Sequence, residues 1–515
     1  MWALRGAITA GENTRQAILA AAAELTQALL TSNNLSSGDI VAGFYTSTPD
    51  LNAAFPAEGG RMAGLQEVPL LSSQEVAVPG GLARCIRVML LVNAPRTAGS
   101  PIHVYLGEAA RLRPDWAERQ ADAAGIGGIS PRENILRIAP YVPGKPIEEV
   151  KRELGLTDVI KLASNENPLG PSPRAQAAIR EAAGRVHLYP DGNAFRMRQA
   201  LAAHLTAQGK DEIVPEQVMV GNGSDELIKM LAETFVHPGD RVVFPTPSFS
   251  EYEFACRVAD GTPVAVPLKD FRVDVEALAA AARIPRTPLV FVANPNNPTG
   301  TLVPRNELEW LIGQLLPETI LVLDEAYFEF VDDPAYSPGL TWVAAGRPVV
   351  VLRTFSKIYG LAGLRVGYGV APAGLVGLVQ RVREPFNVNS LAQEAALAAL
   401  GDTEHVSRSR ELIRQGREEL TRELTARGLR VIPSQANFLY FDIGVDCRRV
   451  FQELLREGVI VRTGDIFGNP TFLRVTIGLP EENGRFLQSL DRVLAAVDAA
   501  VDSDVDSLQP GSPTS

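Results

Sequence analysis

The sequence contains few cysteines and no long apolar run. Its three cysteines, Cys85, Cys256 and Cys447, lie far apart and form no C-x-x-C pair, so neither a disulfide framework nor a cysteine zinc site is suggested. No segment reaches the roughly 18 uninterrupted apolar residues of a membrane-spanning helix, and the N-terminus "MWALRGAITAGENTRQ" lacks the apolar run of a secretory signal. These absences predict a soluble protein of the reducing cytoplasm.

Positive charge is also scarce. The chain has 49 Lys and Arg against 60 Asp and Glu, a net charge of -11, which argues against a nucleic-acid or membrane-surface partner because such partners select basic faces. His187, His204, His237 and His405 show no metal-like spacing, so no metal site is expected. The favoured partners are therefore small molecules.

Two domains and a tail are expected in these 515 residues. Residues 1–118 combine one alanine-rich helix with apolar strand-like runs and predict a compact α/β domain. Residues 119–132 are polar and rich in alanine and glycine, as a linker is, and the polar segment 501–515 reads as a disordered tail. Residues 133–500 form the second domain.

The second domain alternates amphipathic helices with short apolar runs such as "DRVVFP", "PLVFVANP" and "PVVVLRTFS". This alternation predicts a mostly parallel sheet with helices on both faces, and a smaller α/β part at the C-terminal end. Several runs end in polar loops rich in Gly, Asn, Pro or Asp. Ligands of such sheets bind at the carboxyl ends of the strands, so these loops are the expected site.

One lysine stands out among these loops. Lys357, in "RTFSKIYGLAGLRVGYG", is the last of only seven lysines, and Thr354, Ser356 and Arg365 lie near it. A lone loop lysine is usually a solvated charge. Three other loops, in "GNGSDE", "NPNNPTG" and "LVLDEAYF", favour a functional role for it.

Together the four loops match the needs of pyridoxal phosphate, whose aldehyde needs an amine, whose ring nitrogen needs an acidic partner, and whose phosphate needs amides, hydroxyls and a cation. Lys357 is the candidate amine and Asp324 the candidate partner of the ring nitrogen. The helix start in "GNGSDE" offers free N–H groups to a phosphate. The remaining expected contacts are Asn297 and Tyr327 at the ring oxygen, and Ser224, Asp225, Thr354, Ser356 and Arg365 at the phosphate.

Residues 133–500 resemble the histidinol-phosphate aminotransferase group of the fold-type I aminotransferases. The resemblance rests on "KLASNENPLGPSP", "YPDGNAFRMRQAL", "GNGSDE", "FPTPSFSEY", "NPNNPTG", "DEAYFEF", "RTFSKIYGLAGLRVGYG" and "FLRVTIG", in the family's order. It implies that Phe249 stacks on the cofactor ring and that Arg474 binds the substrate carboxylate. It also implies a homodimer, in which Tyr189 reaches the phosphate of the partner subunit's cofactor. Core packing is the competing interpretation of Phe249 and Tyr189.

Residues 1–118 resemble the monofunctional α/β chorismate mutases, which are trimers with sites between subunits. The resemblance rests on "LRGAITA", "TPDLNAAFPAEGGR", "PLLSSQEVAVPGGLARCIRVML" and "IHVYLGEAARLRPD". It implies that Arg87 approaches the ether oxygen of chorismate, Arg5 a carboxylate and Glu75 the ring hydroxyl, with Phe55, Arg61, Ser72, Tyr105 and Arg113 completing the pocket. Glu58 stands where the family often has lysine, and Ser72 where it often has cysteine.

Two questions stay open at this stage. The amino-group acceptor is imidazole acetol phosphate, as in histidine synthesis, or an aromatic 2-oxo acid such as prephenate or phenylpyruvate. The first domain either converts chorismate or only senses an aromatic ligand. A decarboxylase would share Lys357 and Asp324, but the expected carboxylate clamp at Arg474 disfavours it.

Overall fold

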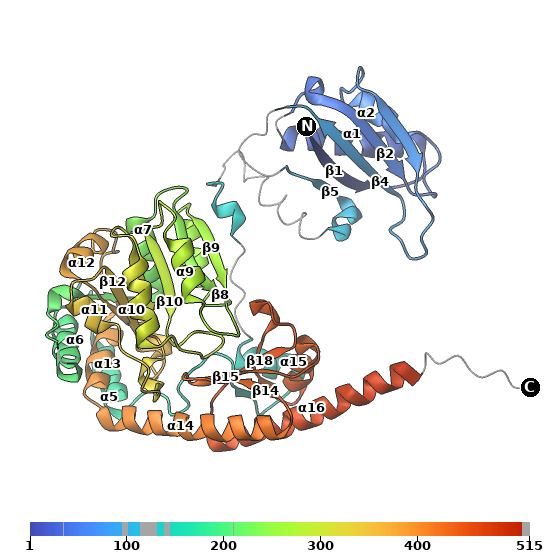
Figure 1. Cartoon of the computed structure of the whole chain (residues 1–515). Coiled ribbons are helices and arrows are strands. Elements are labelled where there is room, and N and C mark those ends of the chain that lie inside the picture. The colour runs from blue at the N-terminus through green and yellow to red at the C-terminus, as the bar shows by residue number, and fades with distance from the viewer. Residues whose placement is uncertain (34, 95–100, 114–130, 139–144, 210, 507–515) are drawn as a thin grey trace, which may run out of the picture. The chain divides into compact units, whose positions relative to one another are not determined.

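The computed structural model describes residues 1–33, 35–94, 101–113, 131–138, 145–209 and 211–506. The chain divides into two compact units, Met1–Ala139 and Pro140–Ser515 (Figure 1). Most of the linker expected at 119–132 lies outside the described residues.

The first unit is a five-stranded sheet with two helices on one face. The strand order is β3-β2-β4-β1-β5, in which β2 and β1 both run antiparallel to β4, while β3 and β5 run parallel to their neighbours. The elements are β1 (Trp2–Thr9), α1 (Arg15–Ser32), β2 (Ile40–Ser47), α2 (Pro56–Met62), β3 (Leu70–Gln74), β4 (Cys85–Val92) and β5 (Val104–Leu106).

Strand alternation gives this sheet two different faces. Ile86, Val88 and Leu90 of β4 point to α1 and α2 and join the core of the unit. The alternate residues Arg87 and Met89 lie on the second face, where Arg87 is level with Thr46 of β2 and Ala7 of β1. That second face carries the polar groups of the first candidate site.

The second unit is built on a seven-stranded sheet in the order β7-β13-β12-β11-β10-β8-β9. Six of these seven strands run in one direction, and β13 runs opposite to them. The strands are β7 (Val218–Gly221), β8 (Arg241–Thr246), β9 (Thr262–Pro267), β10 (Leu289–Ala293), β11 (Ile320–Asp324), β12 (Val349–Thr354) and β13 (Gly367–Val370).

The central strands are buried on both faces, which explains their continuous apolar runs. Leu289 and Phe291 of β10 pack with α7 (Ser224–Phe235), α8 (Glu251–Val258) and α12 (Ala373–Val379). Val290 and Val292, the alternate residues, pack on the other side in the main core with α6 (Phe195–Gln208), α9 (Val275–Ala282), α10 (Arg305–Gln314), α11 (Leu340–Ala344) and α13 (Ser390–Leu400). The fold class predicted from the alternation, a mostly parallel sheet between two helical layers, is confirmed.

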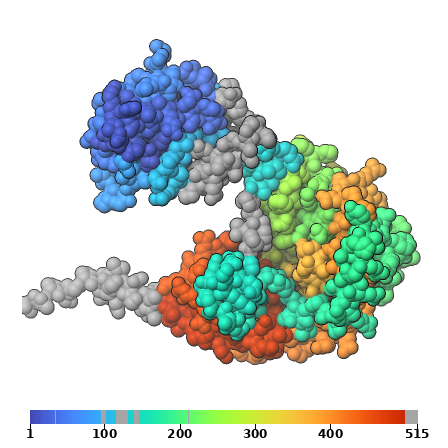
Figure 2. Space-filling view, turned by 180° about the vertical axis from the view of Figure 1, so that it is seen from behind, coloured from blue at the N-terminus to red at the C-terminus, as the bar shows by residue number. Residues whose placement is uncertain are grey.

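A smaller lobe combines both ends of this unit. Its antiparallel sheet, in the order β14-β15-β18-β17, contains β14 (Arg430–Ile432), β15 (Phe438–Asp442), β17 (Arg462–Thr463) and β18 (Phe472–Thr476). The segment near residue 150 lies against the C-terminal part of this unit (Figure 2). There Val150 of α4 (Ile147–Leu154) packs with Leu455 and Ile460. The other elements of this lobe are β6 (Ile160–Lys161), α15 (Cys447–Arg456), β16 (Val459–Ile460) and α16 (Pro480–Asp506), which extends into the predicted tail. Helix α5 (Pro173–Ala182) lies beside α13 instead (Figure 1).

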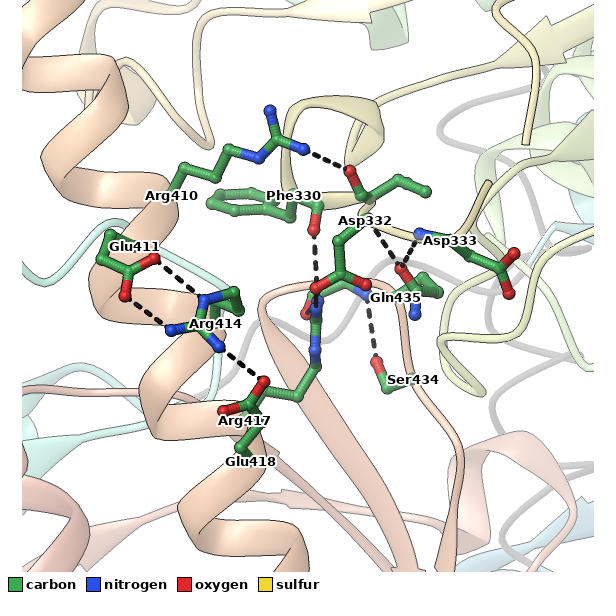
Figure 3. A network of polar contacts seen from close by, with 12 residues as sticks. Phe330, Asp332, Asp333, Arg410, Glu411, Arg414, Arg417, Glu418, Ser434 and Gln435 are labelled. Carbon is green, nitrogen blue, oxygen red and sulfur yellow. Dashed lines mark hydrogen bonds and ion pairs between the residues drawn. The ribbon is translucent and has the colours of Figure 1, made fainter. Parts of the chain in front are cut away.

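The long helix α14 (Thr403–Ala426) spans both lobes (Figure 1). Its Arg417, which is buried, donates to the carbonyl oxygens of Phe330 at 3.2 Å and Ala436 at 3.4 Å and pairs with Asp332 at 2.5 Å (Figure 3). Gln435 accepts from the backbone N–H of Asp332 at 3.0 Å. These contacts hold the loop after β11 against the loop before β15.

No helix in the described ranges is long and apolar enough to cross a membrane. Over the same residues, no group of three or more His, Cys, Asp or Glu side chains could hold a metal ion.

Candidate active sites

The lysine loop joins β12 to β13 at the carboxyl edge of the large sheet. Lys357 is partly buried, and its Nζ lies 3.1 Å from the carbonyl oxygen of Ser164 and 5.7 Å from the centre of the Tyr327 ring. Tyr327 follows β11, and its hydroxyl oxygen accepts a hydrogen bond from Asn165 Nδ2 at 3.0 Å. The structure thus brings Lys357 and Tyr327 together.

Asp324 ends β11 with its carboxylate inside the protein, where only 4% of its surface is exposed. Tyr252 of α8 donates to Asp324 Oδ2 at 2.8 Å, and the backbone N–H of Ala326 donates to Oδ1 at 3.2 Å. Burial raises the pKa of Asp324 to about 6, although these hydrogen bonds lower it. A buried carboxylate of this kind gains from a positive partner.

Phe249 is attached to the same cluster. Its ring is partly buried and lies edge-on to the Tyr252 ring, with the centroids 5.8 Å apart. Tyr252 was missed in the sequence analysis, although it stands within the quoted "FPTPSFSEY". Its hydroxyl group explains how Asp324 keeps an oriented carboxylate at a buried position.

The polar groups expected at the phosphate meet around β13. Arg365 pairs with Asp225 at 2.7 Å, at the first turn of α7. Thr354 is level with Gly367 of β13 and donates its hydroxyl proton to Ser356 Oγ at 2.9 Å. Ser224 begins α7, and its backbone nitrogen would lie 2.6 Å from a Cβ placed on Gly367. The helix start, the hydroxyls and the arginine therefore converge.

Two glycines make room for this arrangement. A side chain at Gly367 would collide with the start of α7, and a Cβ at Gly223 would lie 2.7 Å from Arg365 Nη2. Gly223 also has a φ of +85°, in the left-handed region that glycine adopts without strain. An amine, a buried carboxylate and an anion cradle at a helix N-terminus together fit pyridoxal phosphate.

Arg474 lies on β18 and is 6% exposed. It donates to Asn297 Oδ1 at 2.5 Å and to the carbonyl oxygen of Ala163 at 2.7 Å. Asn297 thus connects the "NPNNPTG" loop of the large lobe to the candidate carboxylate clamp of the small lobe. Arg462 of β17, missed in the sequence analysis, is directly opposite Arg474 in the antiparallel pair.

Tyr189 does not reach the other site residues in this chain. It is 82% exposed, and its ring stacks on Phe386 with the centroids 4.6 Å apart. Val186, Leu188 and Phe195 near it are also exposed. The position is compatible with the predicted contact across subunits and does not match the competing core role.

In the first unit, Arg87 and Glu75 form an ion pair on the second face of the sheet. Thr46 donates its hydroxyl proton to the other oxygen of Glu75 at 2.5 Å. Tyr105 lies on the same face, since it is level with Ala7 and packs with Cys85. This cluster was predicted apart from Thr46.

Arg5 and Arg113 are both exposed and lie around His103, whose ring Nδ1 accepts from the backbone N–H of Arg5 at 3.1 Å. Burial, with the charges of Arg113 and Arg5, lowers the pKa of His103. His103 was not predicted from the sequence. Two guanidinium groups near His103 give this end of the sheet positive charge suited to anions.

Phe55, Arg61 and Ser72 are separated from that cluster within one chain. Phe55 is 70% exposed at the start of α2, Arg61 lies in the same helix, and Ser72 accepts from the backbone N–H of Ala57 at 3.1 Å on the helix-covered side of the sheet. Glu58, which stands at a position where lysine was expected, forms an ion pair with Arg15.

Comparison with known proteins follows the same division. The family model for aminotransferase class I and II matches residues 157–490, and the model for chorismate mutase type I matches residues 1–116. Histidinol-phosphate aminotransferase from Moorella thermoacetica is 56% identical over 365 residues, covering 71% of this chain and 93% of the relative. Histidinol-phosphate aminotransferase 2 from Carboxydothermus hydrogenoformans is 48% identical over 369 residues, which are 70% of this chain and 99% of the relative.

A solved structure agrees with these relatives. The crystal structure of histidinol-phosphate aminotransferase from Sinorhizobium meliloti in complex with pyridoxal-5'-phosphate has a TM-score of 0.66 and 29% identity, over 73% of this chain and 99% of that chain. Pyridoxal phosphate is the cofactor of the second unit. The chain belongs to the class I and II aminotransferases and carries a chorismate mutase domain of type I at its N-terminus.

Proposed function

We propose that the second unit transfers an amino group between an amino acid such as glutamate and imidazole acetol phosphate, as a histidinol-phosphate aminotransferase. The observation that supports this acceptor is the placement of Arg462 directly opposite Arg474 on neighbouring strands. Directly opposite residues of antiparallel strands project from the same face of the sheet, so the two guanidinium groups start side by side.

Arg462 has no ion-pair partner among the described residues. Two like charges side by side favour a doubly charged ligand group, such as a phosphate ester. Arg474 alone suffices for the carboxylate of the amino donor. The two arginines together suit the phosphate of the acceptor, which phenylpyruvate lacks.

Each predicted site residue has a task in this reaction. Pyridoxal phosphate supplies an aldehyde and an electron-withdrawing ring. Lys357 Nζ carries the cofactor between turnovers and, when released, moves the α-proton of the substrate. Asp324 holds the positive charge on the ring nitrogen. Tyr327 and Asn297 bind the ring oxygen, and Phe249 packs on the ring.

Ser224, Asp225, Thr354, Ser356 and Arg365 hold the cofactor phosphate. Because Asp225 is paired with Arg365, its carboxylate orients the guanidinium while the backbone N–H groups of α7 face the anion. Tyr189 of each subunit extends into its partner's site, and the proposed assembly is a homo-oligomer in the cytoplasm. Its exposed stack with Phe386 is the surface that supports this subunit contact.

We test the acceptor with Arg462→Gln. Loss of one hydrogen bond to a charged group corresponds to roughly 10- to 100-fold, so the KM for imidazole acetol phosphate should rise by about that factor. The KM for glutamate should change much less. Arg448→Gln is the control, because Arg448 is exposed and already paired with Asp465 at 2.6 Å.

An aromatic 2-oxo acid is the second candidate acceptor, and the fusion to a chorismate mutase domain favours it. Steady-state kinetics with imidazole acetol phosphate, prephenate and phenylpyruvate in parallel separates the two candidates. A higher kcat/KM for phenylpyruvate, unchanged in Arg462→Gln, would refute the phosphate acceptor.

For the first unit we propose conversion of chorismate to prephenate. Support comes from the Arg87–Glu75 pair with Thr46 on the second face of the sheet, where an arginine can offset charge on the breaking ether bond. Phe55, Arg61 and Ser72 lie on the helix-covered side, so a complete pocket needs them from a neighbouring subunit. Ultraviolet assay of chorismate loss distinguishes turnover from the alternative, in which the unit only senses a ligand.

A further inference from the structure

Three consecutive residues, Ala163–Asn165, contact the candidate site at three points. The carbonyl oxygen of Ala163 accepts from Arg474, and that of Ser164 accepts from Lys357. Asn165 Nδ2 donates to the Tyr327 hydroxyl oxygen. The segment therefore touches the substrate clamp, the catalytic amine and the phenol expected at the cofactor oxygen.

The hydrogen bonds around Asn165 have a fixed direction. A backbone N–H can only donate, and that of Asn165 donates to Thr476 Oγ1 at 2.9 Å. The Thr476 hydroxyl therefore turns its own proton to Asn165 Oδ1, 3.1 Å away. With its oxygen engaged there, the Asn165 amide must present its nitrogen to Tyr327, whose oxygen accepts at 3.0 Å.

The hydroxyl proton of Tyr327 remains at the end of this series of hydrogen bonds. The Tyr327 hydroxyl group accepts from Asn165, so its own proton points elsewhere. Within the described ranges no protein acceptor receives it. The proton is available to a ligand in the site.

Asn165 is held firmly in this position. It is 2% exposed, and its carbonyl oxygen accepts from Asn437 Nδ2 at 3.0 Å. Its φ is +55°, a left-handed conformation that asparagine tolerates better than most residues. Uncommon backbone conformations of this kind persist where surrounding contacts fix them, and they concentrate at functional sites.

We propose that Asn165 and Thr476 are positioning residues that aim the Tyr327 proton at the phenolic oxygen of the bound cofactor. The inference rests on the proposed placement of Tyr327 beside that oxygen. A donor there stabilises the anionic form of the oxygen and so disfavours protonation of the bound cofactor. The chain of hydrogen bonds thus sets the pH at which the cofactor changes its visible absorbance.

The test is a pH titration of that absorbance in the full-length holoenzyme. In Asn165→Asp an oxygen that accepts replaces the donating nitrogen, so the Tyr327 proton turns to it. The midpoint should rise by about one to two pH units, the size expected for one hydrogen bond to a charged group. Thr476→Val should raise the midpoint less, because the amide can then turn over, and Thr476→Ser should leave it unchanged.

A double-mutant cycle with Tyr327→Phe separates positioning from the added charge. Tyr327→Phe alone should raise the midpoint, and Asn165→Asp should then add no further shift. A further shift of equal size in that background would overturn the inference, since the charge would act without the phenol. If Asn165→Asp fails to fold, the pair Thr476→Val and Thr476→Ser decides, and equal midpoints for both overturn it.

Failure of the inference differs from failure of the proposed site. An unchanged midpoint in Tyr327→Phe means that Tyr327 does not face the cofactor oxygen. A raised midpoint in Tyr327→Phe, with wild-type values in Asn165→Asp and Thr476→Val, leaves the site intact and removes only the role of the hydrogen-bond chain.

Discussion

Asp324 should destabilise the enzyme that lacks its cofactor. Burial raises its pKa from 3.8 to about 6, so the folded state binds a proton more tightly than the unfolded chain does. The stability it contributes is therefore present at acid pH and lost as the pH rises through that window. A difference of about two pKa units is equivalent to about 3 kcal/mol above pH 7, and about half of that at pH 5.

Asp324→Asn should remove this cost, because the amide oxygen can accept from the backbone N–H of Ala326 while the amide nitrogen donates to the Tyr252 hydroxyl oxygen, which can accept as well as donate. Urea unfolding of the full-length apoenzyme should show the variant more stable than wild type by up to about 3 kcal/mol at pH 8, and by less at pH 5. Pyridoxal phosphate should reverse the order, since the wild-type carboxylate then has a positive partner.

Asp240→Asn is the matched control. Asp240 is also buried, at 6% exposure, but it already pairs with Arg286 at 2.8 Å. Its substitution should lower stability at pH 8. Equal stabilities of Asp324→Asn and wild-type apoenzyme at pH 8 would refute the argument from burial.

Lys357→Ala should abolish the visible band of the bound cofactor and all transamination while chorismate turnover is kept, and a retained band in absorption spectroscopy would mean that another amine binds the aldehyde. Arg87→Ala should slow chorismate turnover by about 100- to 1,000-fold in the ultraviolet assay; Arg111→Ala, which changes an exposed side chain, should not, and equal rates for both variants would contradict the assignment. Glu325→Ala removes the ion-pair partner that lies 2.8 Å from the buried Arg353, and it should lower the free energy of unfolding by about 3–5 kcal/mol. A loss under about 1 kcal/mol in urea titration would contradict this, because it would mean that the unpaired Arg353 charge costs little.

The sequence predicted those features that depend on short, ordered motifs. Asp324 could be placed because it ends an apolar run, and Lys357 because it is the only lysine after Lys269 and lies in a hydroxyl-rich loop. Both follow from local pattern and from the rule that parallel strands end at one edge. The fold class, the two family resemblances and the cofactor were predicted in this way and are confirmed.

Residues that act through long-range packing were harder to predict. Asn165 and Thr476 are more than 300 positions apart, yet they share two hydrogen bonds. Arg462 gains its meaning from strand register, which no composition or spacing reveals. Tyr252 resembled an ordinary core aromatic until its hydroxyl group was seen on Asp324. The roles of the named site residues stay predictions until the variants above are measured.

The reversed direction of β13 has a consequence for how this enzyme can vary. Because β12 and β13 form a hairpin, the segment between them leaves the sheet and returns to it at the same edge. The single loop between β12 and β13 therefore carries both Lys357 and Arg365, and no crossover helix separates them. Insertions or deletions between Lys357 and Arg365 would change the span between amine and guanidinium while leaving every strand pair intact.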